Sequence, residues 1–371
     1  MGQGGFILEA QTNAISVTMG AQGRVQFTNV FPDDGFVTEW VVAGDATART
    51  ITLPTPSGRT EGALSYNYTV YWGDGLSSTV TSYNDANRAH TYAVDGTYQI
   101  RIQGTMEGWS INNGTDKLKI RKVINWGSSA GGFNGFKYLQ YGFYGCTNLN
   151  YIPPPDQSLT GGIIPASGTG CLFQGFNALF YNCSSLTSIP SEQMFSAHPN
   201  AEAFSYVFRG TGISQIPSYL FEFNTAATTF QHAFSYCPSL GELPVYLFDN
   251  NPNVTTFGSL CESDGNLYVI PPSLFYNNTA CLSWYNAFLY TSKLQHYQNV
   301  FFDVGGESTR FAGQSVDFTN CFYRTTFTGY QGTAEALWTC TFNTVVSTNC
   351  YKGAGNSLTS LTNYASIPTG W

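Results

Sequence analysis

Charged residues are scarce in this chain of 371 residues, in which Asp, Glu, Lys and Arg together make up 10%. Lys and Arg number 15 against 23 Asp and Glu, and the densest basic run is KLKIRK at 117–122. Because binding to phosphates needs concentrated Lys and Arg, the sequence predicts no nucleic-acid partner. No apolar run approaches the roughly 18 residues of a membrane span, so we also expect no membrane insertion.

Motifs that carry catalysis or metal binding are missing as well. The sequence has no CxxC pair and no HExxH, and no GxSxG, GxxxxGKS or GxGxxG in a strand–turn–helix context. His90 precedes the repeat described below, and His198, His232 and His296 fall at three different positions of it, so no ladder of ligands forms. The sequence therefore predicts a protein that is not an enzyme, with no catalytic residue, cofactor or metal.

The N-terminal stretch MGQGGFILEAQTNAISVT has neither a basic segment nor a long apolar stretch. It is unlike a secretory signal, and Phe6 stands where a myristoylation motif has Ser or Thr. We therefore expect the chain to be cytosolic at synthesis.

A repeat of 27 residues is the strongest feature that the sequence does contain. The pairs that mark it, each 27 residues after the last, are Ile189-Pro190, Ile216-Pro217, Leu243-Pro244 and Ile270-Pro271. Leu-Phe pairs such as Leu220-Phe221 follow them. Self-similarity at such a period indicates a solenoid, in which stacked rungs bury one continuous core.

A Phe-x-x-x-Phe segment precedes the Ile-Pro pairs, as in Phe204/Phe208. Four residues make one helical turn, so we expect short helical turns whose two rings point the same way. A small residue follows three positions later, for example Cys183, Thr211 or Cys237. The nine cysteines are odd in number, and we interpret the repeated ones as free thiols that fill the core. A disulfide and a reactive nucleophile are the alternatives.

Residues 36–125 alternate apolar and polar side chains instead. The period of two that marks half-buried strands runs through YNYTVYW (66–72), GTYQIRIQG (96–104) and KLKIRKV (117–123). In the last of these, Leu118 and Ile120 are expected to share one face. Asp74, in the WGDG sequence, is interpreted as a turn residue, with cation binding as the alternative.

The segment AISVTMGAQGRVQFTNVF, within residues 1–35, predicts a β-hairpin with Gly20 or Gly23 at its bend. An N-terminal extension of this kind is expected to act as an attachment or oligomerisation arm.

Two known families resemble parts of the chain. The repeat, seen most clearly in AFSYCPSLGELP (233–244), is similar to BspA-like leucine-rich repeats, which occur on bacterial surfaces and in phage proteins. YWGDG (71–75) and AHTYAVDGTYQIRIQG (89–104) resemble a PKD-type immunoglobulin-like domain. The resemblance implies a mainly β fold with short helical turns. Its expected parts are the arm at 1–35, an immunoglobulin-like β-sandwich at 36–125, and a leucine-rich-repeat solenoid with a C-terminal cap at 126–371.

These resemblances imply an exposed structural or adhesive protein. We expect a phage virion structural protein on the particle surface, as a tail appendage, fibre or capsid decoration. Other virion proteins are the expected partners of the N-terminal region, a host glycan or protein is the expected ligand of the solenoid, and the chain is expected to be a homo-oligomer. The alternative is an adhesin on the bacterial cell surface.

Tyrosines that the core pattern does not require are the candidate binding residues. A ring with a polar edge suits recognition of proteins or sugars at low entropic cost, although such rings also serve contacts between rungs. The candidates are Tyr206, Tyr219, Tyr236, Tyr246, Tyr268, Tyr276, Tyr285 and Tyr290.

Two further sets of polar residues in the repeat, a pair of carboxylates and the asparagines of a turn, can be interpreted from their positions. Glu222 and Asp249 occupy the same place in consecutive repeats, and a polysaccharide-active enzyme that uses them as a carboxylate pair is the third alternative. Asn251, Asn277 and their neighbours in the repeated Asn-Asn turn are expected to bond the local backbone.

Overall fold

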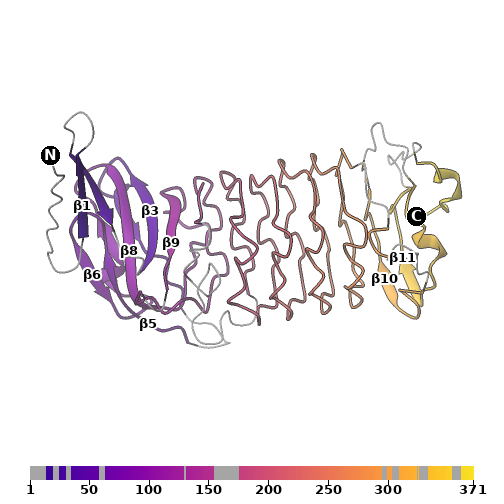
Figure 1. The fold of residues 1–371 in the computed structure, drawn as a ribbon, viewed down its shortest axis with the longest axis horizontal. Helices are drawn as coiled ribbons and strands as arrows, with labels where there is room; N and C mark the ends of the chain where they lie inside the picture. Colours follow the sequence, from indigo (N-terminus) through magenta and orange to yellow (C-terminus); the bar gives the residue numbers. More distant parts are fainter. Residues whose placement is uncertain are drawn as a thin grey trace, which may run out of the picture.

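The computed structural model describes residues 14–19, 25–30, 35–57, 63–128, 131–153, 175–294, 299–302, 309–323, 325, 333–352 and 361–371. The fold is mainly β, and its helical segments within those ranges are three short 3-10 turns, η1 (Ala86–Arg88), η2 (Leu337–Thr339) and η3 (Tyr364–Ser366). The molecule is elongated, with most of its strands gathered at the N-terminal end, a row of coils beyond them and two short strands at the C-terminal end (Figure 1).

Five strands form an antiparallel sheet in the order β6-β5-β8-β3-β9. Tyr66, Tyr68 and Val70 lie on the buried face of β5, while Asn67 between them is exposed, which confirms the predicted alternation. The strands are β3 (Phe36–Val42), β5 (Tyr66–Tyr71), β6 (Ser77–Val80), β8 (Gly96–Met106) and β9 (Ile120–Trp126).

The strand β9 begins later than the sequence suggested. Leu118 precedes it and is 49% exposed, so the prediction that Leu118 shares the buried face of Ile120 is wrong. The reason is a turn in which the Lys119 N–H donates to the Asp116 carbonyl oxygen, which removes Leu118 from the extended run.

Two pairs of strands lie outside this sheet. β4 (Thr50–Thr52) pairs with β7 (Ala89–Thr91) in antiparallel fashion. β1 (Ala14–Met19) pairs with β2 (Val25–Val30), which confirms the predicted hairpin. Gly20 and Gly23, the residues proposed for its bend, lie outside the described residues.

Backbone hydrogen bonds join the sheet to the first coil. After β8, the N–H groups of Trp109 and Ile111 donate to the carbonyls of Tyr138 and Gly142, each at 3.0 Å. On β9, Lys122 forms a parallel bridge to Tyr151. The segment after β8 thus occupies the place of a preceding coil and covers the apolar end of the row.

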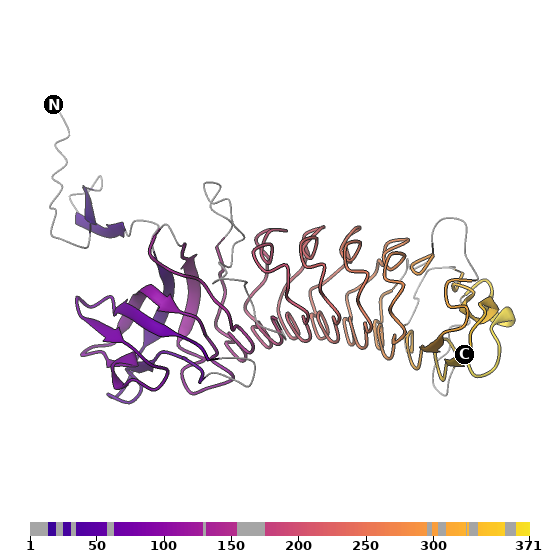
Figure 2. The same cartoon turned by 90° about the horizontal axis from the view of Figure 1, so that it is seen from below.

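Each coil is joined to the next by the backbone of its Phe-x-x-x-Phe segment (Figure 2). The N–H groups of Phe204 and Phe208 donate to the carbonyls of Thr229 and Ala233 in the following coil, at 3.0 and 2.9 Å. The segment is not the helical turn that four-residue spacing suggested, because its middle residue has a left-handed backbone, with φ of +60° at Tyr206. Both rings still face the core. One line of parallel bridges along the row joins Ala203 to Thr229, Thr229 to Thr256, Thr256 to Ser283 and Ser283 to Asp317, and a separate bridge joins Glu242 to Val269.

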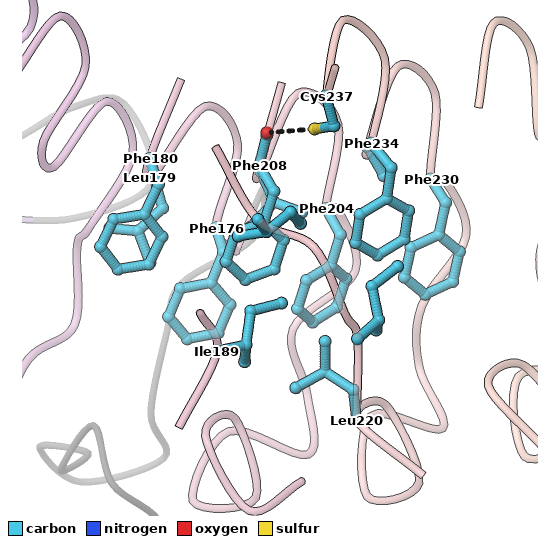
Figure 3. Packing of buried hydrophobic residues seen from close by; sticks show 14 of the residues in the cluster. Phe176, Leu179, Phe180, Ile189, Phe204, Phe208, Leu220, Phe230, Phe234 and Cys237 are labelled. Carbon is cyan, nitrogen blue, oxygen red and sulfur yellow. Dashed lines mark hydrogen bonds between the residues drawn. The ribbon is translucent and has the colours of Figure 1, made fainter. Parts of the chain in front are cut away.

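Stacked rings fill the interior of the row (Figure 3). Phe208 lies between Phe180 and Phe234, with ring centroids 5.6 and 5.8 Å apart and planes within 10° of parallel. The Cys237 thiol donates to the Phe208 carbonyl oxygen at 3.2 Å. The described cysteines are free, and all but Cys340 are buried, as predicted. Burial raises the pKa of the Cys183 thiol well above its usual range, so the thiol stays protonated.

A column of buried asparagines runs beside the rings. The Asn251 side chain donates from Nδ2 to the carbonyls of Phe221 and Asn224 in the preceding coil, at 3.1 and 2.9 Å. Asn224 and Asn278 repeat this pattern one coil away on either side. Arg310 ends the column by donating to the Asn278 carbonyl. The expectation that Asn251 bonds its local backbone is therefore wrong, because the side chain joins successive coils.

Asp264 stands where the other coils have a small core residue, such as Thr211, Cys237 or Thr291. Its side chain is fully buried, and its Oδ1 accepts a hydrogen bond from the Cys237 N–H at 2.6 Å. Burial raises the pKa of this carboxyl well above its usual range. The fold therefore favours the protonated, neutral form of Asp264.

Asp264→Asn is expected to stabilise the protein at neutral pH. Because the folded pKa is raised, the carboxyl's contribution to stability is full below the unfolded pKa of about 4 and is lost as pH rises towards the folded value. Asparagine keeps an oxygen for the Cys237 N–H and does not ionise. Thermal unfolding across pH measures the effect, with Glu242→Gln, an exposed carboxyl, as control. A gain that does not grow with pH contradicts the prediction.

The C-terminal end departs from the regular repeat. β10 (Ser315–Asp317) pairs in parallel with β11 (Thr344–Val346), which extends the row by one more coil. Leu361 and Ile367 are buried, as the predicted terminal rung requires, whereas Leu358 lies outside the described residues.

Glu335 closes the side of the coil at residues 299–302. Its carboxylate oxygens accept hydrogen bonds from the N–H groups of Val300 and Phe301, each at 3.2 Å, in place of carbonyls from a further coil. Burial raises the pKa of Glu335 to about 8, while the two N–H groups and Arg310 favour its charged form.

Candidate binding surface

The tyrosines predicted as binding residues lie at the surface. Tyr206 is half-buried, and the other seven are exposed by 38–50%. These seven are Tyr219, Tyr236, Tyr246, Tyr268, Tyr276, Tyr285 and Tyr290.

The structure brings only some of the candidates together. Tyr219 and Tyr246 come from consecutive coils and stack with centroids 5.2 Å apart and planes 7° from parallel. Tyr236 and Tyr290 occupy the same place two coils apart, with Ser263 between them. The candidates therefore fall at several different positions of the repeat.

Several of these tyrosines have an unfavourable backbone conformation. Tyr219, Tyr236, Tyr246 and Tyr290 have φ between +58° and +62°, a region that costs an L-residue roughly 1–2 kcal/mol. The places equivalent to Tyr236 hold Gly145, Asn182, Gly210 and Ser263, residues suited to such a turn. Tyrosine is not required by the turn or by the core, which favours a role for its side chain at the surface.

A compact group of polar and aromatic side chains surrounds Arg209 on four consecutive coils in the middle of the row. We call it the Arg209 cluster, and its members are Tyr181, Tyr206, Arg209, His232, Tyr236 and Glu262. The guanidinium carbon lies 5.5 Å from the centroid of the Tyr181 ring, 5.6 Å from that of Tyr206 and 4.6 Å from that of Tyr236. Rings at this range attract a cation through their faces.

His232 connects the charges of the cluster. Its ring stacks on Tyr206 at 4.6 Å, its Nδ1 lies 3.1 Å from Nη1 of Arg209, and a Glu262 carboxylate oxygen lies 3.7 Å from the same Nδ1. Burial, and secondly the positive charge of Arg209, lower the pKa of His232 to about 4. The imidazole is therefore neutral at physiological pH, so Nδ1 accepts from Arg209 and Nε2 carries the proton.

Sequence reasoning identified Tyr206 and Tyr236 of this cluster and missed its charged members. One signal was available, because Arg209 is the only Lys or Arg between residues 138 and 292. His232 shows in the sequence only as a histidine that has no equivalent histidine in neighbouring repeats.

Asp74 lies in a well-defined turn. Its Oδ1 accepts from the Leu76 N–H at 3.0 Å, and its Oδ2 lies 2.7 Å from Nε2 of His90. His90 in turn stacks on Trp72 at 4.9 Å. These contacts agree with the interpretation of Asp74 as a turn residue.

Glu222 and Asp249 are both half-buried in consecutive coils. Burial raises the pKa of Asp249 above its usual value. In the part of the chain that the structure describes, no group of three or more His, Cys, Asp and Glu side chains is arranged to hold a metal ion. The same part contains no helix with the length and apolar character to span a bilayer.

No protein-family model, curated protein or solved structure matches the chain.

Proposed function

We propose that the chain is a non-enzymatic structural protein of a phage virion, exposed on the particle, that adheres to a host or environmental surface. One observation carries the proposal. A single hydrophobic core and one ladder of backbone hydrogen bonds run from the N-terminal sheet through the coils to β11, while tyrosines on successive coils remain exposed. A stiff, elongated body that displays aromatic rings suits attachment over a distance better than it suits chemistry in a closed pocket.

The proposed fold follows the sequence resemblance in finer detail. Residues 36–125 are proposed as a PKD-type immunoglobulin-like sandwich, and the contacts within its quoted motif support this. The Tyr92 hydroxyl donates to the Trp72 carbonyl at 2.8 Å, and both rings are buried. Residues 126–371 are proposed as a BspA-like leucine-rich-repeat solenoid, which the coil-to-coil bonding supports.

Residues 1–35 are proposed as the arm that attaches the protein to other virion proteins. Deletion of this arm is expected to abolish incorporation into particles, while the remaining chain keeps its thermal unfolding transition. Immunogold labelling of purified particles with antibody to the coils measures incorporation. A Tyr219→Ala,Tyr246→Ala variant serves as control and is expected to be incorporated normally, because both rings lie on the exposed face of the coils.

Two outcomes contradict the proposal. Normal incorporation of the deleted chain excludes the arm as the attachment site. Labelling of the bacterial envelope in the absence of particles favours an adhesin of the cell surface instead.

A further inference from the structure

We propose that the Arg209 cluster binds a sugar that carries one carboxylate, such as a hexuronate residue of a surface polysaccharide. The site itself follows from the geometry of the cluster, and only the source of the ligand rests on the proposed adhesive function. Three groups of the cluster would recognise such a sugar: the cation of Arg209, the neutral imidazole of His232 and the carboxylate of Glu262.

The guanidinium of Arg209 is held by neighbouring side chains, and among the described residues it forms no ion pair with a carboxylate. The ion pairs of those residues involve other cations, and Arg209 lies far along the sequence from any other Lys or Arg. Its guanidinium is held by the rings of Tyr181, Tyr206 and Tyr236, and one of its nitrogens, Nη1, is bonded to His232. Its remaining N–H groups form the planar fork that pairs with a carboxylate through two parallel hydrogen bonds.

The imidazole of His232 adds a hydrogen-bond donor, and this donor is its Nε2–H group. Since Nδ1 accepts from Arg209, the proton resides on Nε2, on the opposite side of the ring. A neutral N–H donor beside a guanidinium suits a hydroxyl or ring oxygen adjacent to the ligand's carboxylate.

The carboxylate of Glu262 favours a sugar with one negative charge over ligands that carry several. Its half-buried carboxylate lies 3.7 Å from His232 and accepts hydrogen bonds from hydroxyl groups, but it repels a second negative charge. A uronic acid offers one carboxylate to Arg209 and hydroxyl donors to Glu262. An acidic peptide with several carboxylates, or a phosphate dianion, instead brings a further negative charge close to Glu262. The exposed ring of Tyr236 adds an apolar surface for the sugar's C–H groups.

Binding of methyl galacturonoside to the purified full-length chain, followed by saturation-transfer NMR, tests the proposal. Saturable binding in the millimolar range is expected, and the methyl ester of the same sugar, which lacks the charge, is expected to bind at least about tenfold more weakly. This comparison uses the unaltered protein and therefore does not depend on the folding of a variant. Equal binding of acid and ester, or no saturable binding of the acid, overturns the proposal.

Variants locate the site. Arg209→Gln is expected to lose binding, and Arg209→Lys, which keeps the charge without the fork, to weaken it about tenfold. Lys293→Gln, which removes an exposed cation of a later coil, is the matched control and is expected to bind normally. A glutamate peptide that binds more tightly than the uronide overturns the proposal in favour of a protein ligand. Incorporation of Arg209→Gln into particles is expected to be normal, so failure of this site and failure of the virion assignment are distinguishable.

Discussion

Asn251→Ala is expected to destabilise the protein by about 1–3 kcal/mol, since it removes two buried hydrogen bonds that contribute roughly 0.5–1.5 kcal/mol each. The carbonyls are those of Phe221 and Asn224, which both accept from Asn251 Nδ2 in a fully buried position. Removal of the amide also interrupts the column in the middle, although the backbone carbonyl of Asn251 remains and still accepts from Asn278. Chemical denaturation followed by circular dichroism measures the loss.

Asn253→Ala is the matched control for this experiment. Asn253 lies two residues away and also donates to the preceding coil, to the Thr225 carbonyl at 3.0 Å, but its side chain is exposed. Water replaces a bond of that kind, so the variant is expected to lose less than about 0.5 kcal/mol. Equal losses for the two variants would show that burial of the asparagine column contributes nothing to stability.

Phe221→Ala is expected to destabilise the protein by about 3–5 kcal/mol, because it removes a fully buried ring and leaves a cavity. Phe221 stacks in parallel between Phe195 and Phe248, at 5.8 and 6.0 Å. Since each coil is stabilised by its immediate neighbours, amide hydrogen exchange is expected to accelerate first in the coils on either side.

Phe223→Ala removes the same ring from the same coil, but at a site that is 46% exposed. It is expected to change stability by less than about 0.5 kcal/mol. Loss of protection spread evenly from the sheet to β11 in the Phe221 variant would contradict the nearest-neighbour description of the row.

The sequence pattern located the core because burial of large apolar side chains leaves a periodic trace. The pairs Phe204/Phe208 and Leu220-Phe221 recur at the positions that face inward, and each is buried. The strands of the N-terminal sheet were visible for the same reason, since alternation in β5 reports one buried face. The local geometry was not visible, because a left-handed residue such as Tyr206 gives the same spacing of rings as a helical turn.

The polar networks were harder to predict because their partners lie in different coils. Asn251 and Asn278 are 27 residues apart, yet one asparagine in a turn gives no indication of whether it bonds its own backbone or the coil before it. The Arg209 cluster combines positions that are not equivalent: Tyr181 and Arg209 follow a core Phe, whereas His232 lies between two of them. Repeat alignment compares equivalent positions, so it does not reveal such a group.

The two ends of the row are closed by different groups. The length of the protein can therefore change without any change in the residues that close its ends. The backbone after β8 closes one end through Trp109 and Ile111, and Glu335 and Arg310 finish columns near the other. Neither closure depends on how many coils lie between. Gain or loss of one 27-residue unit outside the Arg209 cluster would therefore change the reach of the molecule stepwise, while the sheet, the closures and a cluster confined to four coils stay intact.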